Sequence, residues 1–284
     1  MNRNKIFLHS AICFLLFVSV FLLYLNYKRY VQFTKIVSFL VVYEAVNDHK
    51  PLEMVRWGSP HDGGYVIPKI LLEKSDVMFG YGIGNDICFE SSFSKKYGKE
   101  SFCFDGGVKN IETGSEKCHF FSECIGNDKH LYEDQKSSGK FSSYSEHIKR
   151  HKLENKKIFL KMDIEGAEFD VFDDILKHSN NITGIVLEIH FFDDDDIEKT
   201  EKLLHDLNKD FLLVHVHGNN LCEYTFSAKN LKNRASRAIE LTYINRNIVD
   251  EYKVSNNQKH PTSLDRSNHP NLPDYEFEVL VTPM

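Results

Sequence analysis

The sequence lacks a surplus of basic residues. Its 35 lysines and arginines stand against 41 aspartates and glutamates, and the formal net charge is −6. Nucleic-acid-binding proteins usually carry a basic surplus, so this balance argues against a nucleic-acid partner. Gly-Lys-Ser and Gly-Lys-Thr are absent, which excludes a Walker-type nucleotide loop. No Cys-x-x-Cys pair or local Cys/His spacing indicates structural zinc, and internal repeats and long linkers are missing.

What is present is material for one sizeable core. Of the 284 residues, 42% are apolar and 13% aromatic, which excludes a disordered chain and suggests one domain with appendages. The charge is unevenly distributed, because residues 1–35 contain five basic residues and no acidic residue. The rest of the chain therefore carries a net charge of −11, and the exclusion of nucleic acid is stronger for it.

The N-terminal segment contains twenty successive residues without a formal charge, from Ile6 to Leu25. As a helix, such a run spans the hydrocarbon layer of a bilayer. A cleaved signal peptide is the alternative, but its apolar region is usually shorter and ends at a small-x-small site. We therefore expect a short tail at 1–5, a transmembrane signal anchor in the lipid bilayer at 6–27, a stem at 28–50 and a catalytic domain at 51–284.

The sequence gives less evidence for the orientation of this segment in the membrane. Arg3 and Lys5 precede it and Lys28 and Arg29 follow it, so the positive-inside rule nearly cancels. The short N-terminal tail favours a lumenal catalytic domain, and hence a single-pass protein of the Golgi or endoplasmic reticulum.

From Asp76 onward, short apolar runs alternate with polar, helix-like stretches. This alternation indicates βαβ units and a mostly parallel sheet, whose ligands bind at the carboxyl ends of the strands. The predicted strands are Val77–Gly80, Ser101–Phe104, Phe120–Ile125, Ile158–Met162, Ile185–Ile189 and Leu212–Val216. The predicted helices are Glu90–Tyr97, Ala167–Lys177 and Asp196–Asn208.

The C-terminal region departs from this alternation. Ile239–Ile244 and Phe277–Val281 are predicted strands, and His260–Asp274 between them is rich in proline, asparagine, serine and histidine. A long irregular insertion in a compact domain is usually functional or mobile, so either a functional segment or a surface loop is expected here.

A glycine-rich loop follows the first predicted strand. Gly80, Gly82 and Gly84, with Asn85, allow a tight turn and a close approach of the backbone to a ligand at the start of a helix. The second predicted strand ends at Asp105, where an acidic residue can hold the hydroxyls of a ribose. The loop lacks the third glycine of the dinucleotide motif, so S-adenosylmethionine fits this pattern better than NAD or ATP.

Acidic and histidine side chains lie at the ends of later strands. Asp163 follows the fourth strand, Glu188 and His190 end the fifth, and His215 and His217 end the sixth. Helix capping and ordinary buried histidines would explain some of them. Together they indicate either a general base, at His190 or His217, or a divalent-metal site formed by Asp163, Glu188, His190 and His217.

Asp193–Asp196 is a run of four acidic residues. It is consistent with a solvated loop and a helix N-cap. Alternatively, its Asp-x-Asp pattern could bind a metal and a nucleotide sugar, as in a metal-dependent glycosyltransferase.

Five motifs occur together in one order: Asp62-Gly63-Gly64-Tyr65-Val66, Gly82-Ile83-Gly84-Asn85-Asp86 with Phe89-Glu90, Phe104-Asp105, Lys161-Met162-Asp163-Ile164-Glu165-Gly166-Ala167-Glu168, and His217-Gly218-Asn219-Asn220. In these motifs the chain resembles the FkbM-type methyltransferases that depend on S-adenosylmethionine, and within them a membrane-anchored, methyltransferase-like animal branch. The resemblance covers about residues 52–281.

The resemblance implies a class I methyltransferase (Rossmann-like) fold, with a seven-stranded, mostly parallel sheet and an antiparallel last strand. It also implies methyl transfer to an oxygen, often on a sugar, with Gly82 and Gly84 in the cofactor loop and Asp105 at the ribose. Asp163 and Glu165 would face the site. One departure is Gly80, which stands where the general class I pattern has an acidic residue.

These observations lead to an expected function. We expect an O-methyltransferase that uses S-adenosylmethionine to methylate a sugar hydroxyl of a glycan or glycoconjugate in the secretory pathway. Asp163, His190 and His217 are the expected catalytic residues. The rivals are the metal-dependent glycosyltransferase and a non-catalytic binding protein that retains the fold.

Overall fold

The computed structural model describes residues 3–126, 140–190, 195–221, 236–256 and 259–279. A seven-stranded sheet forms its centre, with the strand order β12-β13-β11-β10-β5-β6-β7. Only β13 runs antiparallel to its neighbours in this sheet. The prediction of a mixed α/β domain with a mostly parallel seven-stranded sheet is therefore confirmed, and the sheet is consistent with a methyltransferase fold.

The observed strands extend most of the predicted ones by one to three residues. The seven are β5 (Val77–Tyr81), β6 (Glu100–Phe104), β7 (Cys118–Phe121), β10 (Ile158–Met162), β11 (Ile182–His190), β12 (Phe211–Gly218) and β13 (Ala238–Asn245). The predicted strand Phe120–Ile125 is divided, because its second half forms β8 (Cys124–Ile125), which leaves the sheet and pairs with β9 (Phe141–Ser142).

Both faces of the sheet are covered, as its sequence pattern requires. In the central strands β5 and β10 every residue is buried. Phe79 and Leu160 pack into one apolar cluster, whereas their neighbours Met78 and Phe159 pack into another. Successive side chains of a strand point to opposite faces, so these two clusters are the two layers of the core.

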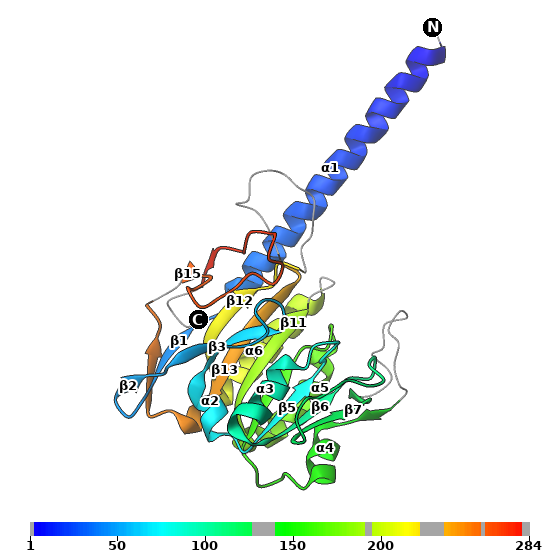
Figure 1. Ribbon diagram of the computed structural model, residues 1–284. Helices are drawn as coiled ribbons and strands as arrows, with labels where there is room; N and C mark the ends of the chain where they lie inside the picture. Colours follow the sequence, from blue (N-terminus) through cyan, green and yellow to red (C-terminus); the bar gives the residue numbers. More distant parts are fainter. Residues whose placement is uncertain (1–2, 127–139, 191–194, 222–235, 257–258, 280–284) are drawn as a thin grey trace.

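Different helices cover the two faces of the sheet (Figure 1). On one face lie α2 (Lys69–Lys74), α3 (Cys88–Tyr97) and the hairpin of β3 (Met54–Gly58) and β4 (Gly64–Pro68). On the other lie α4 (Tyr144–His151), α5 (Glu168–Ile175), α6 (Asp195–Asp210) and the end of α1 (Arg3–Val37). Helix α5 continues into the 3₁₀ turn Leu176–Asn181. A reciprocal capping box of Ser143 and Glu146 starts α4.

The N-terminal helix α1 projects from the rest of the molecule in Figure 1. It covers residues 6–27, for which the sequence predicts a membrane anchor. In the part of the chain that the structure describes, no helix combines the length and the apolar character that crossing a membrane requires. The predicted transmembrane helix is therefore not supported by the structure.

Much of the predicted stem at 28–50 belongs to the domain. Ile36, Leu40 and Val42 are buried in the core layer that contains α6. Strand β1 (Tyr43–Asn47) pairs with β2 (Lys50–Pro51) on one side and with β14 (Glu251–Val254) on the other. The chain thus joins the core well before residue 51, the predicted start of the catalytic domain.

Both predicted C-terminal segments contain a strand, but only the first lies in the main sheet; residues 280 and 281 of the second lie outside the described residues. β13 is the antiparallel strand, inserted between β11 and β12. Phe277–Glu278 (β16) instead pairs with Lys259–His260 (β15) in a separate two-stranded ladder. Between these two short strands, the segment 261–276 is well packed at several positions: Asp265, Asn268 and Tyr275 are buried.

Candidate active site

A large cavity lies at the carboxyl ends of the parallel strands, where the strand order reverses between β5 and β10. Ligands of open α/β sheets bind at this switch point. Its volume is about 590 Å³, which suits a cofactor-sized ligand. Its principal lining residues are Asp62, Gly82, Ile83, Gly84, Asn85, Glu90, Asp105, Glu123, Cys124, Ile125, Gly126, Phe141, Lys161, Asp163, Ile164, Glu165 and Val171.

The glycine loop forms one wall of this cavity. Gly82 has a φ of +68°, and a Cβ at this position would collide with the backbone carbonyl of Asp163. Gly84 has a φ of +53°, and its N–H donates to the Asp105 carboxylate at 2.8 Å. Asp105 also accepts from the N–H of Gly107 at 2.8 Å. It therefore joins the loops after β5 and β6 at the mouth of the cavity, which it lines together with Asn85.

Gly80 has a different position from the one predicted. It lies within β5 and is not among the described residues that line the cavity, so the structure does not place it with Gly82 and Gly84. A Cβ at Gly80 would collide with the Glu90 carboxylate, which enters the cavity from helix α3. Glu90 is only 1% exposed, and neither of its carboxylate oxygens has a hydrogen-bond partner. The folded chain thus places the carboxylate of Glu90 beside Gly80, the position at which the sequence itself has no acidic side chain.

Lys161 is the buried cation of the cavity. It lies on β10, is 5% exposed, and donates from Nζ to the Gly82 carbonyl at 2.9 Å. Although burial acts to lower it, the pKa of Lys161 is raised by Asp163, Glu90 and other nearby carboxylates. Lys161 is therefore protonated at neutral pH, and it fixes the backbone of the glycine loop.

Carboxylates greatly outnumber cations around the cavity. Among the described lining residues, Lys161 is the only lysine or arginine, whereas eight are acidic: Asp62, Asp86, Glu90, Asp105, Glu123, Asp163, Glu165 and Asp170. Burial raises the pKa of Asp62 and Glu90, with nearby acidic residues adding to the effect. A cavity with this charge attracts a cationic ligand and repels an anionic one.

A second feature of the cavity is a cluster at the turn after β10. His190 Nε2 lies 3.8 Å from Asp163 Oδ1 and 3.4 Å from Glu165 Oε2. Its Nδ1 lies 3.1 Å from the buried carboxylate of Glu168, and Glu188 Oε1 is 3.4 Å from Nε2. Asp163 and Glu165 line the cavity, whereas His190 stands behind them, 2% exposed.

The arrangement of this cluster allows two kinds of chemistry. One ligand atom each from Asp163, Glu165 and His190 lies within 4.8 Å of the others, a set that can hold a divalent cation. Without a cation, the same carboxylates and imidazole can hold and accept a proton. The structure therefore brings together Asp163, Glu188 and His190 of the predicted metal set.

Comparison with protein families relates this geometry to known proteins. Residues 75–213 match the family model of the methyltransferase FkbM domain, and this range carries the glycine loop, Asp105 and the Asp163 turn. This part of the chain is therefore similar to the methyltransferase FkbM domain. None of the curated proteins matches the chain at a significant level.

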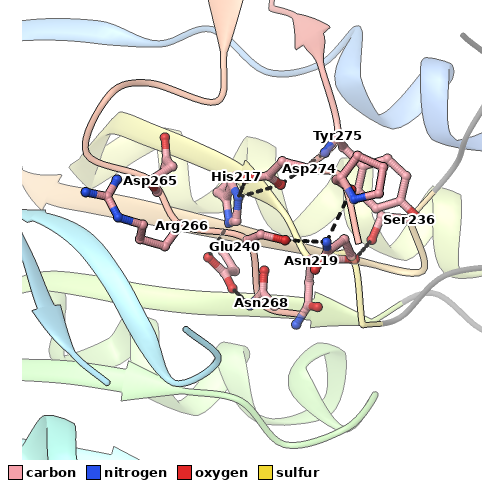
Figure 2. Close-up of polar contacts among 12 residues, drawn as sticks. His217, Asn219, Ser236, Glu240, Asp265, Arg266, Asn268, Asp274 and Tyr275 are labelled. Carbon is pink, nitrogen blue, oxygen red and sulfur yellow. Dashed lines mark hydrogen bonds and ion pairs between the residues drawn. The ribbon is translucent and has the colours of Figure 1, made fainter. Parts of the chain in front are cut away.

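His217 does not join the site of the methyltransferase domain. Figure 2 shows its imidazole between Glu240 and Asp274, with Nδ1 2.9 Å from Glu240 and Nε2 3.0 Å from Asp274. Although burial acts to lower it, these carboxylates raise the pKa of His217 to about 11. Both nitrogens face carboxylates and the ring is protonated, so the structure does not bring His217 together with Asp163 and His190 as the sequence predicted.

The acidic run predicted as an alternative nucleotide-sugar site is only partly visible. Asp193 and Asp194 lie outside the described residues. Asp196 is 5% exposed near the start of α6, where its carboxylate accepts from Lys199 at 2.9 Å. It does not line the cavity of the methyltransferase domain.

Three site residues were missed or misinterpreted from the sequence. The sequence does point to Lys161, since a lysine inside an apolar strand is unusual and indicates a buried charge that is paired with an acidic group. Asp62 was named only as part of a family motif, without a role in the site, yet it lines the cavity. Glu90 also belongs to such a motif, but its contact with Gly80 exists only after helix α3 has packed on the sheet.

Proposed function

We propose that this domain transfers a methyl group from S-adenosylmethionine to a hydroxyl oxygen. The observation that carries the proposal is the acidic cavity at the switch point, with one lysine against eight carboxylates among its described lining residues. S-adenosylmethionine presents a sulfonium and an ammonium group, both cationic, so this charge favours its binding. The match of residues 75–213 to a methyltransferase family model supports this reaction class.

The lining residues fit the parts of this cofactor. Asp105 lies where it can accept hydrogen bonds from the ribose hydroxyls, and Gly82 leaves the backbone open beside it. Ile125 and Phe141 offer apolar surface for the adenine. The carboxylate of Glu90, which has no hydrogen-bond partner, is placed to accept a hydrogen bond from the methionine ammonium. This bond would offset the free-energy cost of burying the carboxylate without a partner.

When bound, the cofactor supplies a methyl group on a positively charged sulfur. The acceptor hydroxyl forms the new C–O bond as the C–S bond breaks, and its proton must leave. We propose that Asp163 orients this hydroxyl, with His190 behind it as proton acceptor and Glu168 holding the ring. If a divalent cation at Asp163, Glu165 and His190 activates the hydroxyl instead, EDTA will abolish turnover; if not, turnover will be unaffected.

For the acceptor, we propose a sugar hydroxyl of a glycan or glycoconjugate. Asp62, Asp163 and Glu165 place carboxylates along the cavity, where they can accept hydrogen bonds from neighbouring hydroxyls. The secretory-pathway location predicted from the sequence stays a prediction.

A thermal-shift panel tests the cofactor. At about 100 times its dissociation constant, S-adenosylhomocysteine should raise the Tm by roughly 5–10 °C, since such saturation adds about 2.7 kcal/mol. A nucleotide sugar with Mn²⁺ should leave the Tm unchanged, because its diphosphate is repelled. The Gly82→Val variant is the control, since a side chain there displaces the Asp163 backbone. A shift with the nucleotide sugar alone would favour a glycosyltransferase.

Glu90→Gln should weaken binding of S-adenosylhomocysteine about tenfold to a hundredfold, because a hydrogen bond to a charged group is worth about 1.5–3 kcal/mol. Isothermal titration calorimetry measures this loss. Adenosine is the matched ligand control: it lacks the amino-acid end, so its affinity should be equal for both proteins. An equal loss for adenosine would show that Glu90 only supports the fold of the cavity.

A further inference from the structure

A second cluster of titratable side chains lies away from the cofactor cavity, where the C-terminal segment packs against strand β12. His215 lies on β12, His260 ends β15, and Asp265 follows in the segment between β15 and β16. Their exposed fractions are 5%, 4% and 7%. One ligand atom from each residue, an imidazole nitrogen or a carboxylate oxygen, lies within 4.8 Å of the other two. None of the three lines the cofactor cavity.

Two members of this cluster hold one another in place. His215 Nε2 lies 2.8 Å from Asp265 Oδ1. The other carboxylate oxygen of Asp265 accepts from the Thr262 backbone N–H at 2.6 Å and from the Thr262 hydroxyl at 2.8 Å. Asp265 is thus held with one carboxylate oxygen directed at the imidazole of His215.

His260 is the least firmly held member. Neither of its ring nitrogens makes a hydrogen bond of ordinary distance and angle, although the side chain is buried. The ring stacks on Phe277, with centroids 5.6 Å apart, and meets His215 edge-on at 5.5 Å. A buried polar group without a well-formed hydrogen bond is rare and costly, and a bound ion would account for it.

There is room for such a ligand and for its entry. His215 and His260 line a cavity of about 270 Å³, together with Glu44, Ser255 and Thr262. A bound ion could therefore complete its coordination with water. The three side chains come from positions 45 and five residues apart, so no local spacing in the sequence announces the cluster.

We propose that His215, His260 and Asp265 bind a divalent transition-metal ion, and that zinc is the ion that the site selects. Two imidazoles and one carboxylate are typical zinc ligands, whereas magnesium and calcium prefer sites made entirely of oxygen. The ion would tie the segment that follows β15 to the sheet.

The position of this segment gives the ion a structural role. The same segment supplies Asn268, which donates to Glu240 at 2.6 Å and to Asp62 at 3.1 Å. It also supplies Asp274, the partner of His217, as Figure 2 shows. Because Asp62 lines the cofactor cavity, the ion would hold in place a segment that supports the wall of that cavity.

Metal titration of the full-length chain tests the proposal. The EDTA-stripped protein is titrated with Zn²⁺, bound zinc is measured by mass spectrometry, and Tm is followed. The His260→Gln variant should bind this zinc equivalent about 100-fold more weakly, or not at all, and lose the zinc-dependent rise in Tm. Asp163→Asn is the matched control: it changes the other metal-competent cluster, so it should retain the equivalent and the rise.

A second measurement keeps the test decisive if His260→Gln fails to fold. Co²⁺ bound by wild-type protein and by Asp163→Asn should give visible absorption bands typical of low-coordinate nitrogen and oxygen ligation, and Zn²⁺ should displace it. The proposal is overturned if wild-type protein binds neither ion, or if a folded His260→Gln variant binds zinc with unchanged stoichiometry and affinity. It is also overturned if Asp163→Asn alone removes the bands.

Discussion

Replacing Asp163 by Asn should reduce turnover by about 10²- to 10⁴-fold. The acceptor hydroxyl then loses the carboxylate that orients it and that lies between it and His190, the proposed proton acceptor. The measurement is S-adenosylhomocysteine release with a panel of glycosides as acceptors. Binding of S-adenosylhomocysteine itself, followed by Tm, should persist, since Gly82, Glu90 and Asp105 are unchanged.

A matched control for this experiment lies on helix α5. Asp173 is 79% exposed and pairs with Lys202 outside the cavity, so Asp173→Asn should retain the wild-type rate. An Asp163→Asn protein that binds cofactor and turns over at the wild-type rate would remove the assignment of Asp163, while leaving the proposed cofactor untouched.

Replacing His217 by Ala should lower the free energy of unfolding by about 3–5 kcal/mol, because it leaves the facing carboxylates of Glu240 and Asp274 without their shared cation. Urea unfolding monitored by circular dichroism near pH 6.5 measures the loss. His205→Ala is the control: His205 is also a histidine, but its side chain is 74% exposed, and its loss should be within about 0.5 kcal/mol of zero.

The same triad predicts a pH dependence. The pKa of His217 rises from 6.5 to about 11 on folding. The folded protein therefore keeps a proton that the unfolded chain releases. The stability that this proton contributes is fully present below pH 6.5 and is lost progressively as the pH rises towards 11, by at most about 1.4 kcal/mol per unit.

Comparison with the His217→Ala variant isolates this contribution. Unfolding of both proteins is measured between pH 6.5 and 9, and the difference between them should shrink as the pH rises. A difference that stays constant over this range would contradict the doubly paired imidazolium.

Sequence patterns predicted the parts of the molecule that depend on neighbouring residues. The alternation of apolar runs located all seven strands of the sheet, because burial on both faces demands continuous apolar residues. The glycine loop and Asp105 were located for a similar reason: a tight turn and a strand end are local features. The structure places Gly82, Gly84, Asn85 and Asp105 around one cavity.

Features that arise only in three dimensions were missed. His217 was taken as a base because its partner Asp274 lies 57 residues later and cannot be paired with it from spacing alone. Gly80 was taken as a cofactor contact, although its missing side chain instead accommodates Glu90. The strand at Phe277 was predicted, but its pairing with His260 was not. Each of these contacts joins different elements of the fold, so it arises only when they pack together.

All described residues that line the cofactor cavity fall between Asp62 and Val171, although the domain continues for about another hundred residues. The later elements therefore lie beside the cavity and do not form its described wall; they are β11, β12, β13 and the segment after β15. Evolution can alter these later elements while the cofactor contacts stay the same. An exchange of the residues after α5 between two relatives would therefore leave every described residue of the cavity wall unchanged.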